Sequence, residues 1–172
     1  MKLFSLILTF CILSNFLFAQ EKQLEKAIEH INNSDYMLAI EKLQEAKEKA
    51  SKKENLKADI NYYLSLAHFK NNQPQQAKNY IEESISKAKP SVDAFSFHFL
   101  AGQIYHQLFL YEEAKQAYEK SIEANKSFGE AYFHLGNILL ETNQLKEACL
   151  NFKLAIKHNY TKGQEISDKI CK

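Results

Sequence analysis

The segment LYEEAKQAYEKS, residues 110–121, contains the spacing around which the whole chain is organised. The small residue Ala114 is followed four positions later by the larger Tyr118 and, after three more, by the small Ser121. Spacings of four and three place these side chains on one face of an α-helix. The pattern recurs in DYMLAIEKLQEA (35–46), QPQQAKNYIEES (73–84) and QLKEACLNFKLA (144–155), with successive alanines 38, 37 and 34 residues apart. Such a period indicates a chain built from an internal helical repeat.

The recurring positions alternate between small and large side chains. The small residues are Ala39 and Ala46, Ala77 and Ser84, Ala114 and Ser121, and Ala148 and Ala155; the large residues between them are Leu43, Ile81, Tyr118 and Phe152. Two helices cannot cross closely over a large side chain, so we expect the small residues to lie where helices meet.

A partner helix is predicted before each segment. It is clearest in AYFHLGNILLETNQLKEA (131–148), where small Gly136 stands at a position that Gly102 and Ser65 occupy in the two preceding repeats. This helix-turn-helix pattern resembles the tetratricopeptide repeat over essentially all of residues 20–172. The resemblance implies an all-α fold, a right-handed α-solenoid with repeats at about 20–55, 58–91, 95–128 and 129–162.

The longer periods predict three or four extra residues before the first helices of repeats 2 and 3, in connections around 51–57 and 87–93. Repeat 2 also has Asn61 and His68 where large apolar residues are usual in the family. The tail, residues 163–172, is predicted to be a short capping helix, because the last helix of a solenoid otherwise exposes an apolar face.

The cap would lie against repeat 4 and bring Cys171 near Cys149. A disulfide between them would close a loop of about 22 residues and stabilise the fold by about 3 kcal/mol. Two free thiols are the alternative.

Residues 1–19, MKLFSLILTFCILSNFLFA, combine one positive charge at Lys2 with an apolar run and a final small residue. This arrangement predicts a secretory signal peptide cleaved between Ala19 and Gln20, and periplasmic export. A secreted protein or an uncleaved N-terminal anchor is the alternative; after cleavage we expect no membrane contact. Cleavage would remove Cys11, leaving two cysteines that an oxidising compartment can join.

Composition excludes several classes of function. The chain has 22 basic residues, all lysine, against 21 acidic ones, so it lacks the positive charge typical of nucleic-acid-binding proteins. Its 4 glycines are too far apart for a phosphate-binding loop, and neither H-E-x-x-H nor G-x-S-x-G occurs. We therefore expect no enzyme activity, no metal site and no cofactor.

The resemblance implies a concave groove lined by the first helix of each repeat. The candidate binding residues on these positions are Tyr62, Leu66, Phe69 and Lys70 in repeat 2; Phe99, Gln103 and His106 in repeat 3; and Phe133, Asn137 and Leu140 in repeat 4. Aromatic rings among amides suit a peptide. In the alternative, these rings pack inside the solenoid or against another protomer.

The sequence thus predicts a non-catalytic adaptor or scaffold of the cell envelope that binds a protein or peptide. Two other functions stay open. The chain could be a structural subunit of an envelope complex or a homo-oligomer that associates with itself; an enzyme acting on envelope polymers is the third reading.

Overall fold

The computed structural model describes residues 22–50, 54–87 and 94–171, all of them in helices or short turns. A first helix covers residues 22–32 and is followed by α2 (Tyr36–Lys49), α3 (Glu54–Lys70), α4 (Pro74–Lys87), α5 (Ala94–Gln107), α6 (Tyr111–Ala124), α7 (Gly129–Glu141), α8 (Leu145–Lys157), a 3-10 turn (Thr161–Gly163) and α9 (Gln164–Ile170). The all-helical expectation is confirmed. The predicted signal peptide lies outside the described residues.

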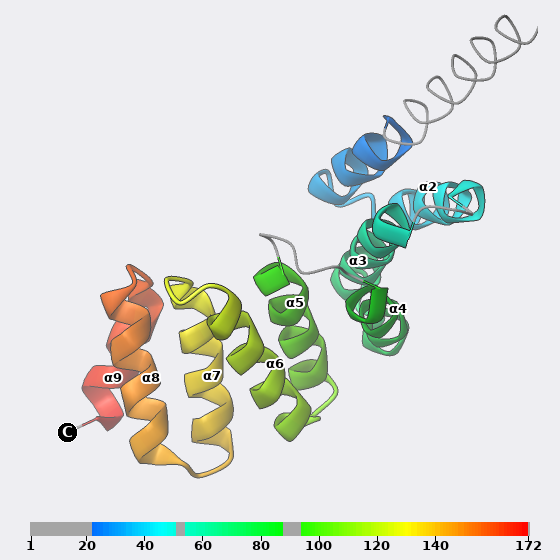
Figure 1. Cartoon of the computed structure of the whole chain (residues 1–172). Coiled ribbons are helices and arrows are strands. Elements are labelled where there is room, and N and C mark those ends of the chain that lie inside the picture. Colours follow the sequence, from blue (N-terminus) through cyan, green and yellow to red (C-terminus); the bar gives the residue numbers. More distant parts are fainter. Residues whose placement is uncertain (1–21, 51–53, 88–93, 172) are drawn as a thin grey trace, which may run out of the picture.

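Neighbouring helices pack as hairpins, and the hairpins stack on one another. The three most extensive helix pairs are α3 with α4, α5 with α6, and α7 with α8. Between hairpins, α2 contacts α3 and α6 contacts α7, and α8 contacts the cap α9. Figure 1 shows α5 to α9 lying side by side, with α9 at the end of the row. The apolar core consequently runs along the stack as a series of linked clusters.

The small residues of the repeat lie at the helix crossings. Ala39, Ala77, Ala114, Ala148 and Ala155 are completely buried. Two serines at these positions also join the helices of a pair: Ser84 Oγ on α4 donates to Ala58 O on α3 at 2.7 Å, and Ser121 Oγ on α6 donates to Phe95 O on α5 at 2.9 Å. Ser65 on α3 donates to Ala77 O on α4 at 2.8 Å. These three serine hydroxyls are thereby paired, as is usual for buried polar groups.

The turn inside each repeat uses one residue with a left-handed backbone. In repeat 3, Leu110 N donates to Tyr105 O at 2.9 Å and Phe109 N donates to His106 O at 2.9 Å. These two bonds are those of a Schellman motif, whose penultimate residue must have positive φ. The residues at that position, and at the end of α8, are Ser34, Asn72, Phe109, Asn143 and Asn159, with φ between 56° and 66°.

Helix α3 is longer than the spacing predicts. It begins at Glu54, so residues 54–57 are helical and not part of the connection expected around 51–57. The extra turn places Leu56 against the N-terminal core cluster, which explains why it is helical. Residues 51–53 and 88–93, the rest of the two expected connections, lie outside the described residues. Asn61 and His68 are both buried.

The C-terminal helix caps repeat 4. Ile166 and Ile170 of α9 pack against the last core cluster, and Cys171 is bonded to Cys149 of α8, with 5.5 Å between the two Cα atoms. The structure therefore contains the expected disulfide. The cap is shorter than expected: Thr161–Gly163 form a 3-10 turn and the helix spans Gln164–Ile170.

Candidate functional site

A groove of about 620 Å³ lies where the first helices of repeats 2, 3 and 4 approach one another near their C-terminal ends. Its lining comes from α3 and its turn (Phe69, Lys70, Asn72), from α5 and its turn (Gln103, His106, Gln107, Phe109), from α6 (Tyr118) and from α7 (His134, Glu141). We call it the Tyr118 pocket. It is large enough to hold one or two side chains of a ligand.

Tyr118 reaches the pocket because Gly102 has no side chain. A Cβ atom built on Gly102 would lie 2.5 Å from Tyr118 Cε1 and 2.6 Å from Cδ1, so the ring rests directly on the backbone of α5. The same arrangement recurs in repeat 4, where a Cβ on Gly136 would lie 2.6 Å from Phe152 Cε1. At this contact between glycine and an aromatic ring, the two repeats differ by the hydroxyl group of Tyr118.

The Tyr118 hydroxyl is buried and makes no hydrogen bond within the described part of the chain. Burial, followed by the charges of Glu130 and Glu141, raises the pKa of this phenol, so it stays protonated and can donate a hydrogen bond. A buried hydroxyl without a partner destabilises the folded state. Packing does not explain its presence, since phenylalanine serves at the equivalent position in repeat 4.

His134 is stacked on Tyr118, with ring centroids 5.6 Å apart. Burial, with smaller contributions from the charges of His106 and Lys162, lowers the pKa of His134 to about 4. Its imidazole is therefore neutral at pH 7 and contributes an aromatic, uncharged wall to the pocket.

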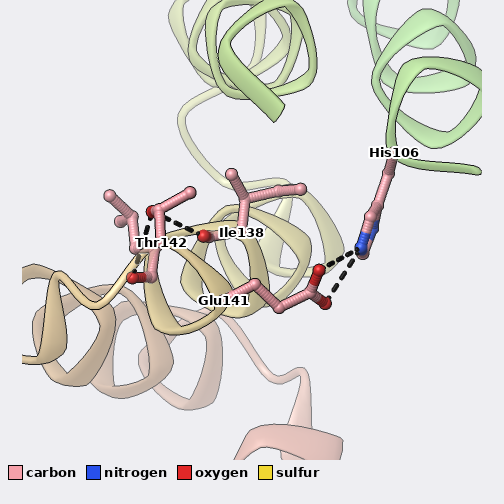
Figure 2. A network of polar contacts seen from close by, with 5 residues as sticks. His106, Ile138, Glu141 and Thr142 are labelled. Carbon is pink, nitrogen blue, oxygen red and sulfur yellow. Dashed lines mark hydrogen bonds and ion pairs between the residues drawn. The ribbon is translucent and has the colours of Figure 1, made fainter. Parts of the chain in front are cut away.

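A polar contact joins repeats 3 and 4 at the edge of the pocket. His106 Nε2 on α5 lies 3.0 Å and 3.1 Å from the two carboxylate oxygens of Glu141 on α7, and Figure 2 shows the two side chains pointing toward each other from separate helices. Thr142 Oγ1, just after Glu141, donates to Ile138 O at 2.8 Å and holds the end of α7 (Figure 2). The Glu141 carboxylate is thus already engaged within the protein.

Only part of the predicted groove set lines this pocket. Phe69, Lys70, Gln103 and His106 do so, whereas Tyr62 lines a separate hollow beside Leu24 and Phe97. The others lie elsewhere: Leu66, Phe99, Phe133 and Leu140 pack against the core clusters, and Asn137 is half-buried on α7.

Phe99 and Phe133, the central aromatic residues of the predicted groove, are held by other rings. Phe99 lies 4.8 Å from Phe128 and 5.3 Å from His134, measured between centroids, and Phe133 lies 5.3 Å from Tyr160. Most of the surface of these two rings is therefore buried within the solenoid. This agrees with the alternative reading, in which the aromatic residues at these positions pack inside the fold.

Six lining residues lie outside the candidate set given above: Asn72, Gln107, Phe109, Tyr118, His134 and Glu141. Tyr118 comes from a second helix, which the resemblance assigns to the outer layer. A signal for it existed in the chain, since glycine at 102 and 136 is paired with an aromatic residue sixteen positions later. Phe109 had a signal too, because asparagine stands at its position in repeats 2 and 4.

Among the described residues, no helix is both long and apolar enough to span a bilayer. In the same part of the chain, no three side chains of the metal-ligating types come together.

Two overlapping segments of the chain match a known repeat family. Residues 95–128 and 117–149 each match a tetratricopeptide-repeat family profile. No curated protein matches the chain.

Solved structures share the fold at low sequence identity. The crystal structure of MamA has a TM-score of 0.70 at 23% identity, covering 84% of this chain and 81% of MamA. YrrB, described as a TPR protein with an unusual peptide-binding site, has a TM-score of 0.68 at 19% identity, covering 86% of this chain and 76% of YrrB. A chain of the APC/C hetero-tetramer Cut9–Hcn1 has a TM-score of 0.79 at 12% identity, covering 89% of this chain and 30% of that one.

Proposed function

We propose that this tetratricopeptide-repeat chain is a non-catalytic adaptor or scaffold that binds a peptide segment of a partner protein in the Tyr118 pocket. The observation that carries the proposal is the buried, unpaired hydroxyl of Tyr118 beside an open groove. A site that leaves a polar group without a partner in the free protein gains that hydrogen bond when a ligand supplies the acceptor.

The composition of the pocket supports a peptide ligand. Aromatic side chains supply contact area, and the amide of Gln103 can bond to an extended backbone. The fold supports it as well, because tetratricopeptide-repeat modules are protein-binding scaffolds and the structurally similar YrrB is described as having a peptide-binding site.

Site-specific photo-crosslinking tests this function. A photoreactive amino acid in place of Gln103 should yield a covalent adduct with the partner. The same amino acid in place of Leu150, which is 58% exposed on α8 and does not line the pocket, should yield none. Equal adducts from both positions, or adducts from position 150 alone, would show that the pocket is not the binding site.

We further propose that the protein acts in the cell envelope after cleavage of the leader. The leader pattern of residues 1–19 and the Cys149–Cys171 disulfide support this location, since structural disulfides belong to oxidising compartments. N-terminal sequencing of the protein recovered from a periplasmic extract should begin at Gln20. Recovery of the chain with Met1 intact in the cytoplasmic fraction would contradict it.

A further inference from the structure

Phe109 stands in the turn of repeat 3 at a position that the other repeats fill with small polar residues. Its φ is 59°, and Ser34, Asn72 and Asn143 occupy the equivalent position in repeats 1, 2 and 4. Asparagine tolerates the left-handed region because its side chain bonds locally, whereas a bulky side chain there is strained. In repeat 3, therefore, the left-handed turn position holds a residue that is unfavourable in this backbone conformation, whereas repeats 1, 2 and 4 have a small polar residue there.

The Phe109 ring contributes little to the fold in return. The side chain is 75% exposed, more than any other large apolar residue in the described part of the chain, and its aromatic contact is an edge-on approach to Tyr111 at 6.3 Å. The other exposed large apolar residues, Met37, Leu38, Leu145 and Leu150, do not line the Tyr118 pocket. Strained, exposed residues are typical of binding sites, where the ligand provides the compensating contacts.

We infer that Phe109 is the principal anchor of the Tyr118 pocket, and that the occupant is an extended peptide segment in which an aromatic side chain stands next to an acidic one. This inference rests on the proposed function and names its ligand class.

The aromatic preference follows from the rings around the pocket. Phe69 lies near the end of α3 and Phe109 lies in the turn after α5, and the rings of Tyr118 on α6 and His134 on α7 also line the pocket. His134 stacks on Tyr118 as an uncharged ring. Aromatic pairs gain energy beyond their buried area when rings meet edge to face or offset, so a ligand ring is the best complement.

The acidic preference follows from the charges that are left unpaired. Lys70 in the pocket lining makes no ion pair within the described residues, whereas the Glu141 carboxylate is engaged by His106. The Tyr118 hydroxyl adds a second unpaired donor. A carboxylate beside the ligand's ring can accept hydrogen bonds from these groups, and surface charge of this kind sets specificity more than affinity.

The experiment combines peptide selection with a variant that separates binding from folding. Random dodecapeptides displayed on phage are selected on the purified parent protein, on F109N and on K70E. Peptides enriched on the parent are then synthesised, labelled with fluorescein, and titrated by fluorescence polarisation against all three proteins and against the control variant L150Q. Thermal unfolding of each protein is followed by circular dichroism.

We expect the parent to enrich peptides with an aromatic residue next to Asp or Glu. F109N should bind them at least tenfold more weakly while unfolding at a higher temperature, by about 2–4 °C, because asparagine relieves the backbone strain. K70E should lose the acidic preference and keep the aromatic one. L150Q, which removes an exposed apolar side chain outside the pocket, should bind like the parent.

Other outcomes separate this inference from the proposed function. If F109N binds the enriched peptides as tightly as the parent, Phe109 is not the anchor, although the protein binds peptides. If F109N unfolds at a lower temperature, the ring has a structural role and the inference is overturned. If peptides without an aromatic–acidic pair are enriched, the ligand class is wrong, and if the parent enriches nothing, the proposed peptide-binding function itself fails.

Discussion

The ring of Tyr118 lies against the backbone at Gly102, so closely that a single added methyl group on Gly102 would lie 2.5 Å from a ring carbon. Because of this contact, Tyr118 of the second helix α6 reaches the lining of the Tyr118 pocket. The position of Tyr118 in the pocket therefore depends on the absence of a side chain at residue 102.

Gly102→Ala should reduce the free energy of unfolding by about 1–2 kcal/mol. Overpacking against a fully buried ring costs about 1–3 kcal/mol, and alanine returns up to about 1 kcal/mol through its higher helix propensity. Gly163→Ala is the matched control, because the nearest atoms to its added Cβ lie at 3.5 Å and its φ is −73°. Urea denaturation of both variants measures the difference. Equal stabilities would mean that the Gly102 contact is not tight in solution.

Tyr118→Phe should raise the free energy of unfolding by about 1 kcal/mol in the absence of ligand, because it removes a buried hydroxyl that has no partner. Phe152 shows that the ring alone packs well over a glycine. Tyr105→Phe is the control: its hydroxyl donates to Glu82 Oε1 at 3.1 Å, so its loss should leave stability unchanged or slightly lower. A destabilised Tyr118→Phe protein would show that the hydroxyl has a structural partner.

Reduction of the Cys149–Cys171 disulfide should lower the free energy of unfolding by about 3 kcal/mol. The reason is that the unfolded chain gains conformational entropy when the bond, which joins residues with a sequence separation of 22, no longer closes a loop. Chemical denaturation with and without dithiothreitol measures the loss, and the Cys149→Ala/Cys171→Ala double variant should match the reduced protein in both conditions. Hydrogen exchange should then show α9 opening first. Identical denaturation midpoints would mean that the bond contributes nothing to the cap.

Protonation of His134 should make the fold less stable in acid. Its pKa is lowered to about 4 in the folded state, against an unfolded value near 6.5, so between these pH values the unfolded chain binds a proton that the folded chain does not. Stability should therefore fall as the pH decreases from about 6.5 to about 4, by ~1.4 kcal/mol per unit of the pKa difference.

Burial sets the sign of this effect, and the charged groups around His134 do not reverse it. His106 and Lys162 oppose its protonation, and Glu130, 3.9 Å from Nε2, is too distant to offset burial. His134→Gln should lose the part of the slope that belongs to this residue, so the two proteins are compared by urea denaturation at pH 7.5 and pH 5. Parallel pH dependences would contradict the lowered pKa, which an NMR titration of the ring also measures directly.

Periodic spacing made much of the fold predictable. The spacing of Ala114 and Ser121 predicts that both face a neighbouring helix, because every α-helix has the same periodicity. Both side chains are small, as a close helix crossing requires. The cap and its disulfide were predictable for a related reason: the end of a stack must be covered, and the tail was the available segment. The start of α3 at Glu54 was not, since it depends on Leu56 finding space in a core cluster.

The pocket was less accessible to such reasoning. Repeat positions predicted Phe99 and Phe133 as ligand contacts, but the rings of Phe128 and Tyr160, in the connections after α6 and α8, already pack against them. Conversely, Phe109 and Tyr118 could not be predicted as pocket residues from the positions of the first helices alone.

The amino-acid order thus specified which residues form helices and which faces must be small, because these follow from local geometry that repeats along the chain. Which side chains face the groove depended on how the aromatic rings pack between three helices and on which polar groups have no hydrogen-bond partner in the folded chain. Those outcomes arise between residues far apart in the chain, such as Gly102 with Tyr118 and His106 with Glu141, so they exist only once the repeats have stacked.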